Sequence, residues 1–205
     1  MSSSSNVRNL TFAFFSPKPG DDWVNSLVAR ASKHPYCHLE IYFETINQCF
    51  SIQLGETAML RSKNLSSDCY EIVTLAVSMK EYDSCLDFCR KAMQQKLVFD
   101  DRAMWSSYFL HPFCSCCCCC CFKTSENSKK TFCSKIICEA LQHAGVPEVE
   151  HRHPACTTPS RLYSDIMHSK RRVVASVPYK REQMLKTKTI TFLNNVYFRV
   201  DTAVP

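Results

Sequence analysis

The sequence predicts a single α+β domain in which strands dominate the first half and the strongest helix comes late. Hydrophobic residues make up 45% of the 205 residues and charged residues 21%, a balance typical of a folded domain with a sizeable core. A continuous apolar run over residues 10–15 is typical of a buried strand. Residues 132–144 have apolar side chains at helical spacing, and Gly145 and Pro147 then provide stop signals.

The other elements follow from local patterns along the chain. Asp21 or Asp22 is expected to cap a helix that runs to about residue 33. Ser78 and Glu81 have the spacing of a capping box, and a helical apolar stripe follows them. Residues 99–113 are expected to form a loop. Further elements are expected as strands at residues 37–43, 49–53, 58–61, 71–77, 172–177 and 187–200, and as a short helix at residues 160–167.

Charge and glycine content exclude several classes of ligand. The net charge is +6, and the densest basic run covers only residues 170–172, so no nucleic-acid partner is expected. Only three glycines are present, too few for a Gly-rich phosphate-binding loop. No cofactor and no metal ion are therefore expected. Residues 1–9 are interpreted as a polar leader, and residues 10–205 as one domain.

Cysteine is the most unusual feature of the composition, with fifteen residues. The start of the chain has no secretory signal, so we expect a cytoplasmic protein with reduced thiols rather than a secreted one. Adjacent cysteines cannot all point at one tetrahedral ion, which argues against a metal site in the longest run. That run fits either an S-acylation platform that attaches the protein to a membrane surface, or a tolerated low-complexity insertion. It lies in a predicted surface loop at about residues 111–130 and contains Cys114, Cys116, Cys117, Cys118, Cys119, Cys120 and Cys121.

Two residues stand out as candidates for catalysis. Cys133 falls in the first turn of the predicted helix at 132–144, where unpaired N–H groups and the helix dipole stabilise a thiolate. Cys138 lies in the middle of the same helix and lacks that stabilisation. His38 is at the start of a predicted strand, where it can reach a helix N-terminus. A cysteine and a histidine so placed are the nucleophile and general base of thiol hydrolases.

A third residue that orients the histidine is harder to choose. Glu40 shares a strand face with His38, and a buried glutamate needs a partner. Ser51 and Gln53 lie on the next predicted strand. We rank Glu40 and Ser51 nearly equal, with Gln53 third.

The order of these motifs resembles that in a known group of enzymes. The strand motif His-x-x-Ile-Tyr at residues 38–42 comes first, and the helix motif Phe-Cys-Ser-x-Ile-Ile at residues 132–137 comes second. This order is similar to that of the circularly permuted NlpC-like branch of the papain-like thiol hydrolases. The branch includes YiiX-like bacterial proteins, proteins of large DNA viruses and the lecithin–retinol acyltransferase group. Residues 158–163 are also similar to the segment after the catalytic helix in YiiX-like members, and the resemblance covers about residues 10–165.

The resemblance implies a permuted papain-like (NlpC-type) fold, with an antiparallel sheet packed against the helix that bears the nucleophile Cys133. It implies a cysteine peptidase or amidase that acts through a thioester intermediate with His38 as general base and acid, and a virus-encoded origin is among those that it includes. Members usually have the residue that orients the histidine on the following strand, which corresponds to Ser51 or Gln53 here. The substrate is then a peptide, an amide or a lipid ester. Two alternatives stay open, which are a lipid acyltransferase or phospholipase and a catalytically inactive interaction module of the same fold.

Overall fold

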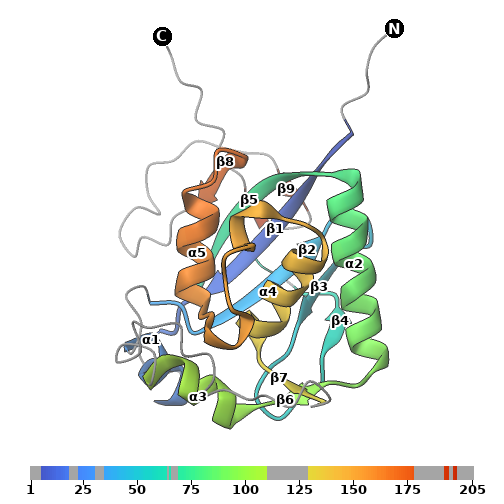
Figure 1. Cartoon of the computed structure of the whole chain (residues 1–205). Helices are drawn as coiled ribbons and strands as arrows, with labels where there is room; N and C mark the ends of the chain where they lie inside the picture. Colours follow the sequence, from blue (N-terminus) through green and yellow to red (C-terminus); the bar gives the residue numbers. More distant parts are fainter. Residues whose placement is uncertain are drawn as a thin grey trace, which may run out of the picture.

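The computed structural model describes residues 6–18, 23–30, 35–63, 65, 69–109, 129–177, 192–193 and 196–197. In these residues the chain is an α+β protein built on a mostly antiparallel sheet, with helices against it (Figure 1). The predicted α+β class is therefore confirmed. The seven cysteines of the run at residues 114–121 lie outside the described residues.

The central sheet has six strands in the order β4-β3-β2-β1-β5-β8, and every neighbouring pair is antiparallel. Strand β1 lies in the middle, and its residue Phe15 pairs with His38, the first residue of β2. The strands are β1 (Val7–Phe15), β2 (His38–Phe43), β3 (Gln48–Ser51), β4 (Met59–Arg61), β5 (Tyr70–Ser78) and β8 (Arg172–Val177). A parallel pair, β6 (Val98–Phe99) with β7 (Lys130–Thr131), and a short hairpin, β9 (Phe192–Leu193) with β10 (Val196–Tyr197), complete the strands described.

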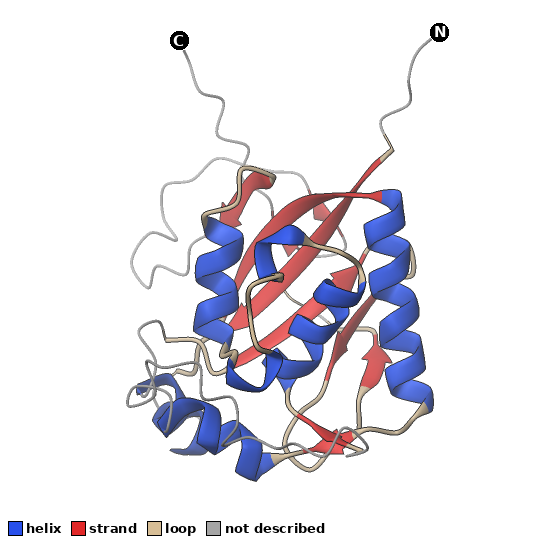
Figure 2. Cartoon of the chain, viewed as in Figure 1, coloured by secondary structure: helices blue, strands red, loops and turns tan. Residues whose placement is uncertain are grey.

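Three helices cover one face of the sheet, as Figure 2 shows. They are α2 (Met79–Gln94), α4 (Cys133–His143) and α5 (Pro159–Met167). Side chains alternate between the two faces of the sheet along β1. Phe12 and Phe14 face the helices, while Ala13 belongs to a smaller cluster on the opposite face. Helix α4 is central, and its buried residues Ile136, Ile137 and Leu141 are fully covered.

Two short helices lie at the end of the sheet where α4 begins (Figure 1). They are α1 (Trp23–Arg30) and α3 (Asp101–Phe109). Val28 from α1 and Met104 from α3 pack with Phe132 in a hydrophobic cluster separate from the main core. This cluster supports the chain immediately before Cys133.

Two helix signals in the sequence are confirmed, the capping box of Ser78 and the stop at Gly145, whereas the predicted cap at Asp21 or Asp22 lies outside the described residues. Ser78 Oγ accepts a hydrogen bond from the Glu81 backbone N–H at 3.2 Å, and the Ser78 N–H donates to the Glu81 carboxylate at 2.7 Å, which completes the predicted capping box. Gly145 follows α4 with φ of +75°, a left-handed conformation that favours glycine. Cys85 and Cys89, on the helix that follows the capping box, are fully buried in the core.

The predicted loop at residues 99–113 is wrong over residues 101–109, which form α3. Asp100 starts this helix, because its carboxylate accepts a hydrogen bond from the Ala103 N–H at 3.1 Å. The apolar pattern of α3 is weak, and its burial depends on α1, a segment distant in sequence. Strand β1 also begins at Val7, within the segment interpreted as a leader, because pairing with β5 extends it to Ser78.

Within the described residues, no helix is long and apolar enough to cross a bilayer. Over the same part of the chain, no group of three or more histidine, cysteine or acidic side chains is arranged to hold a metal ion.

Candidate active site

His38 lies at the end of the sheet closest to the start of α4. It is the first residue of β2, and only 12% of its side chain is exposed. Because side chains alternate along a strand, His38 and Glu40 share one face while Leu39 packs in the main core on the other. The position at the strand end lets the imidazole ring reach the N-terminus of α4.

Cys133 is the first residue of α4, and only 3% of it is exposed. The residue before it, Phe132, is the N-cap and makes no side-chain cap hydrogen bond. The first-turn N–H groups are therefore not taken up by a capping side chain. They and the helix dipole favour negative charge on the Cys133 sulfur and on any oxyanion formed beside it.

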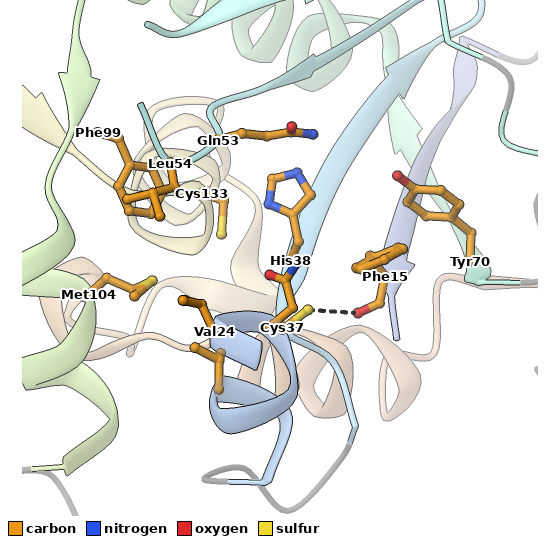
Figure 3. A pocket seen from close by; sticks show the side chains of 12 residues that line it. Phe15, Val24, Cys37, His38, Gln53, Leu54, Tyr70, Phe99, Met104 and Cys133 are labelled. Carbon is orange, nitrogen blue, oxygen red and sulfur yellow. Dashed lines mark hydrogen bonds between the residues drawn. The ribbon is translucent and has the colours of Figure 1, made fainter. Parts of the chain in front are cut away.

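The Cys133 sulfur and the His38 ring face each other across the end of the sheet (Figure 3). Burial alone lowers the pKa of His38, since it disfavours the charged imidazole. A hydrogen bond and charge interaction with Cys133, together with Glu40, outweigh burial and raise the pKa of His38 to about 9. His38 is therefore favoured as an imidazolium at neutral pH, beside the Cys133 sulfur.

Glu40 is fully buried, and three side chains surround its carboxylate. Its Oε1 oxygen lies 3.3 Å from His38 Nε2, accepts a hydrogen bond from Tyr70 OH at 3.2 Å and forms an ion pair with Lys63 Nζ. Burial raises the pKa of Glu40, but the positive charges of His38 and Lys63 prevail and lower it to about 2. Glu40 is thus a carboxylate over the whole physiological pH range.

The two candidates for the orienting residue have different surroundings. Glu40 contacts His38 directly, whereas Ser51 is buried on β3 and pairs with Met59 of β4. Gln53, the third candidate, lines the same cavity as His38, and Figure 3 shows its amide close to the ring. The geometry therefore favours Glu40 over Ser51.

Lys63 and Tyr70 were not identified by sequence reasoning. Lys63 precedes β5 by several residues, and Tyr70 begins that strand. Only the requirement that a buried glutamate be paired pointed to a cation near Glu40, and it did not say which one. Lys63 Nζ also lies 5.1 Å from the centre of the Tyr70 ring, so the two side chains hold each other beside the carboxylate.

Cys138 lies apart from this arrangement. It is fully buried in the middle of α4, and Thr157 Oγ1 contacts its sulfur at 3.8 Å. Burial raises the pKa of Cys138 to about 11, which keeps its thiol protonated. Burial therefore makes Cys138 unsuited to act as a nucleophile.

A cavity of about 340 Å³ opens beside the Cys133 sulfur. Helix α1 contributes Val24 and Val28, and helix α3 contributes Met104. Gln53 and Leu54 follow β3 in the chain, so that the cavity is bounded by several elements (Figure 3). A substrate in this space has its reacting atom next to both Cys133 and His38.

Comparison with known proteins finds no matching family model, no similar curated protein and no similar solved structure.

Proposed function

We propose that the protein is a cysteine hydrolase, with Cys133 as nucleophile, His38 as proton carrier and Glu40 as the residue that orients His38. The observation that supports this best is the contact series from Cys133 through His38 to Glu40 at the edge of a cavity. We also propose that the α+β architecture is the permuted papain-like fold, since a sheet packed against the helix of the cysteine is what that fold requires.

The first half of the reaction forms a thioester. The Cys133 thiolate attacks the carbonyl carbon of an ester or amide, and an S–C bond forms. The oxyanion is stabilised by first-turn N–H groups of α4, including that of Cys133. His38 imidazolium then donates its proton to the leaving oxygen or nitrogen as the C–O or C–N bond breaks.

The second half needs His38 to act as a base, and acylation itself provides for this. The negative charge on Cys133 contributes to the raised pKa of His38. Once the sulfur is acylated that charge is gone, while burial continues to favour the neutral ring. Neutral His38 can then take a proton from water, which attacks the thioester, breaks the S–C bond and releases a carboxylic acid.

Alkylation of Cys133 by iodoacetamide over a range of pH tests this proposal. Peptide mass spectrometry follows Cys133 and, as an internal control, the half-buried Cys156. We expect rapid labelling of Cys133 below pH 7 that is lost in His38→Ala, with Cys156 labelling unchanged. Labelling of Cys133 no faster than that of an ordinary cysteine would refute the enzyme and favour a non-catalytic module.

A further inference from the structure

A second cavity, of about 550 Å³, lies where α2 and α4 meet β7. Figure 1 shows the two helices side by side, with β7 close to the start of α4. From α4, Lys135, Glu139 and His143 line the cavity, and their spacing of four residues places them on one face of the helix. Among the described residues, none lines both this cavity and the one beside Cys133. The second cavity is therefore a separate site.

The ionisable groups of this cavity are mostly basic. Three ammonium groups and two imidazoles line it, together with a single carboxyl group. These groups belong to Lys91, Lys130, Lys135, His143, His153 and Glu139. Lys91 also has a partner outside the lining, since its Nζ lies 2.6 Å from Asp87. The balance of charge within the lining favours an anionic ligand.

The ammonium group of Lys135 is mostly covered but poorly paired. Only 12% of its side chain is exposed, and its ion pair with Glu139 Oε1 has a length of 3.8 Å, too long for a hydrogen bond. Burial raises the pKa of Glu139, so the surroundings oppose the charge of this one counter-ion. Among the described residues, no atom accepts a hydrogen bond from Lys135 Nζ. A covered ammonium group with three donors and no acceptor fits a site for an anion.

Thr131 supplies a second donor without a partner. It lies on β7, lines the same cavity and is only 2% exposed. Its hydroxyl oxygen is buried and, within the described part of the chain, has no hydrogen-bond partner. Buried polar groups are nearly always hydrogen-bonded, so an unpaired hydroxyl and an unpaired ammonium group in one cavity indicate a ligand with several acceptor oxygens.

Other parts of the cavity wall are apolar. Phe88, Leu97 and Ala155 line it, and the centre of the Phe88 ring lies 5.4 Å from that of the His143 ring. The volume is in the range of sites for small organic molecules, which combine apolar walls with a few polar groups. The cavity therefore has room for an organic group beside the anion.

We propose that this cavity binds the phosphate monoester of a small organic molecule. Its phosphate oxygens would accept hydrogen bonds from Lys135, Lys130 and the Thr131 hydroxyl, while its organic part packs against Phe88 and Leu97. Lysine binds phosphate as a point charge, and none of the described lining residues is an arginine, which would pair bidentately with a carboxylate. The phosphate is held by side chains, so the site does not need the glycine-rich loop that the sequence lacks. This site goes beyond the proposed function, because it uses neither Cys133 nor His38.

Isothermal titration calorimetry of the full chain with phenyl phosphate tests the site. The buffer is free of phosphate and has a constant ionic strength, and benzoate and inorganic phosphate are the comparison ligands. We expect phenyl phosphate to bind at least about tenfold more tightly than benzoate, since a dianion makes more charge-assisted hydrogen bonds. It should also bind more tightly than inorganic phosphate, which has no organic group to bury. Absence of phenyl phosphate binding, or equal binding of either comparison ligand, would overturn the proposal.

Two variants assign the binding to this cavity. Lys135→Met should raise the Kd for phenyl phosphate about tenfold or more, because it removes a charged donor, and Thr131→Val should raise it about threefold. Lys80→Met, at an exposed position of α2 outside the cavity, removes the same charge and is the matched control. Its Kd should stay within about twofold of the wild type. Equal weakening in Lys80→Met and Lys135→Met would mean nonspecific charge attraction and would exclude the site, as would an unchanged Kd in both cavity variants.

Thr131→Val also distinguishes ligand binding from a role in folding. Because the hydroxyl has no partner among the described residues, its replacement by a methyl group of similar shape should not lower the free energy of unfolding. Urea titrations with and without phenyl phosphate measure this, and the ligand should stabilise the wild type more than the variant. A destabilised Thr131→Val protein that binds phenyl phosphate as tightly as the wild type would show that the hydroxyl serves the fold, and its assignment to the ligand would be wrong.

Discussion

Lys63 and His38 contact the same carboxylate oxygen, Glu40 Oε1, from two sides. His38 Nε2 lies 3.3 Å from this oxygen, and Lys63 Nζ forms an ion pair with it. Glu40 Oε2 is buried and, among the described residues, has no hydrogen-bond partner, so that the carboxylate interacts through one oxygen. The charge that Glu40 offers to the imidazolium is therefore shared with a lysine, and the lysine should moderate the basicity of His38.

Replacement of Lys63 should raise the pKa of His38. In Lys63→Met the carboxylate of Glu40 faces only one cation, and the charged imidazole is stabilised more strongly. The decline of hydrolysis at high pH, where His38 loses its proton, should then occur above the wild-type position near pH 9. The pH profile of kcat/KM measures this shift. Lys91→Met, on α2 and paired with Asp87, is the control and should leave the profile unchanged.

Removal of the negative charge of Glu40 should act in the opposite direction. Glu40→Gln removes the charge that helps to raise the pKa of His38 to about 9, so the decline at high pH should move toward neutrality. It also leaves Lys63 partly buried without its counter-ion, which should cost about 1–3 kcal/mol of stability. The pH profile and a denaturant titration measure the two effects. A lower activity with an unshifted profile would mean that Glu40 only supports the fold.

Sequence reasoning predicted elements whose signals are local. The capping box of Ser78 and the stop at Gly145 depend on neighbours within a few residues, and both are confirmed. It missed α3, because the burial of Met104 depends on Val28, far away in the sequence. The sequence indicated that Cys133 lies on a helix and His38 on a strand, but it did not give the distance between the two side chains.

The surroundings of Glu40 illustrate the same limit. The charge of a glutamate beside His38 is visible in the sequence, whereas the choice between Glu40 and Ser51 depends on strand register and on which side chains close over the carboxylate. Lys63 and Tyr70 supply that closure from the segment around β5. Contacts of this kind are set by tertiary packing and leave no periodic pattern.

The two cysteines of α4 should respond differently to the same substitution. Cys133→Ser should abolish hydrolysis and change the free energy of unfolding by no more than about 1 kcal/mol, because the exchange is nearly isosteric at a helix end. Cys138→Ser should keep hydrolysis, although it places a hydroxyl in a fully buried position beside Thr157 and lowers stability by about 1–2 kcal/mol. Hydrolysis rates and thermal melts of both variants measure these effects. If Cys133→Ser were still active, the nucleophile would have to be another residue.

Loss of the capping box of α2 should lower stability without lowering activity. Ser78→Ala removes the hydrogen bond from the Glu81 N–H and should cost about 1 kcal/mol of stability. Helix α2 packs beside α4 but contributes no residue to the contact series of Cys133, His38 and Glu40, so kcat/KM should stay within about twofold. Denaturant unfolding and hydrolysis of p-nitrophenyl acetate measure the two quantities. A large loss of activity with little loss of stability would show coupling between α2 and the site.

Stability should depend on pH at both ends of the scale, through His38 and Glu40. The pKa of His38 is raised from 6.5 to about 9, so its contribution is full below pH 6.5 and is lost as the pH rises through 9. The pKa of Glu40 is lowered from 4.5 to about 2, so its contribution is full above pH 4.5 and is lost as the pH falls through 2. The two groups are partners, so their contributions overlap rather than add.

Between about pH 4.5 and 6.5 both groups therefore contribute fully, and the difference in unfolding free energy between wild type and His38→Ala should be largest there. One pKa unit corresponds to about 1.4 kcal/mol, so this difference should fall by a few kcal/mol between pH 6.5 and 9.5. Urea titrations of the two proteins at pH 5.5, 7.5 and 9.5 measure it. A difference that stays constant from pH 5.5 to 9.5 would mean that His38 is not charged in the folded protein, and the thiolate–imidazolium pair would have to be abandoned.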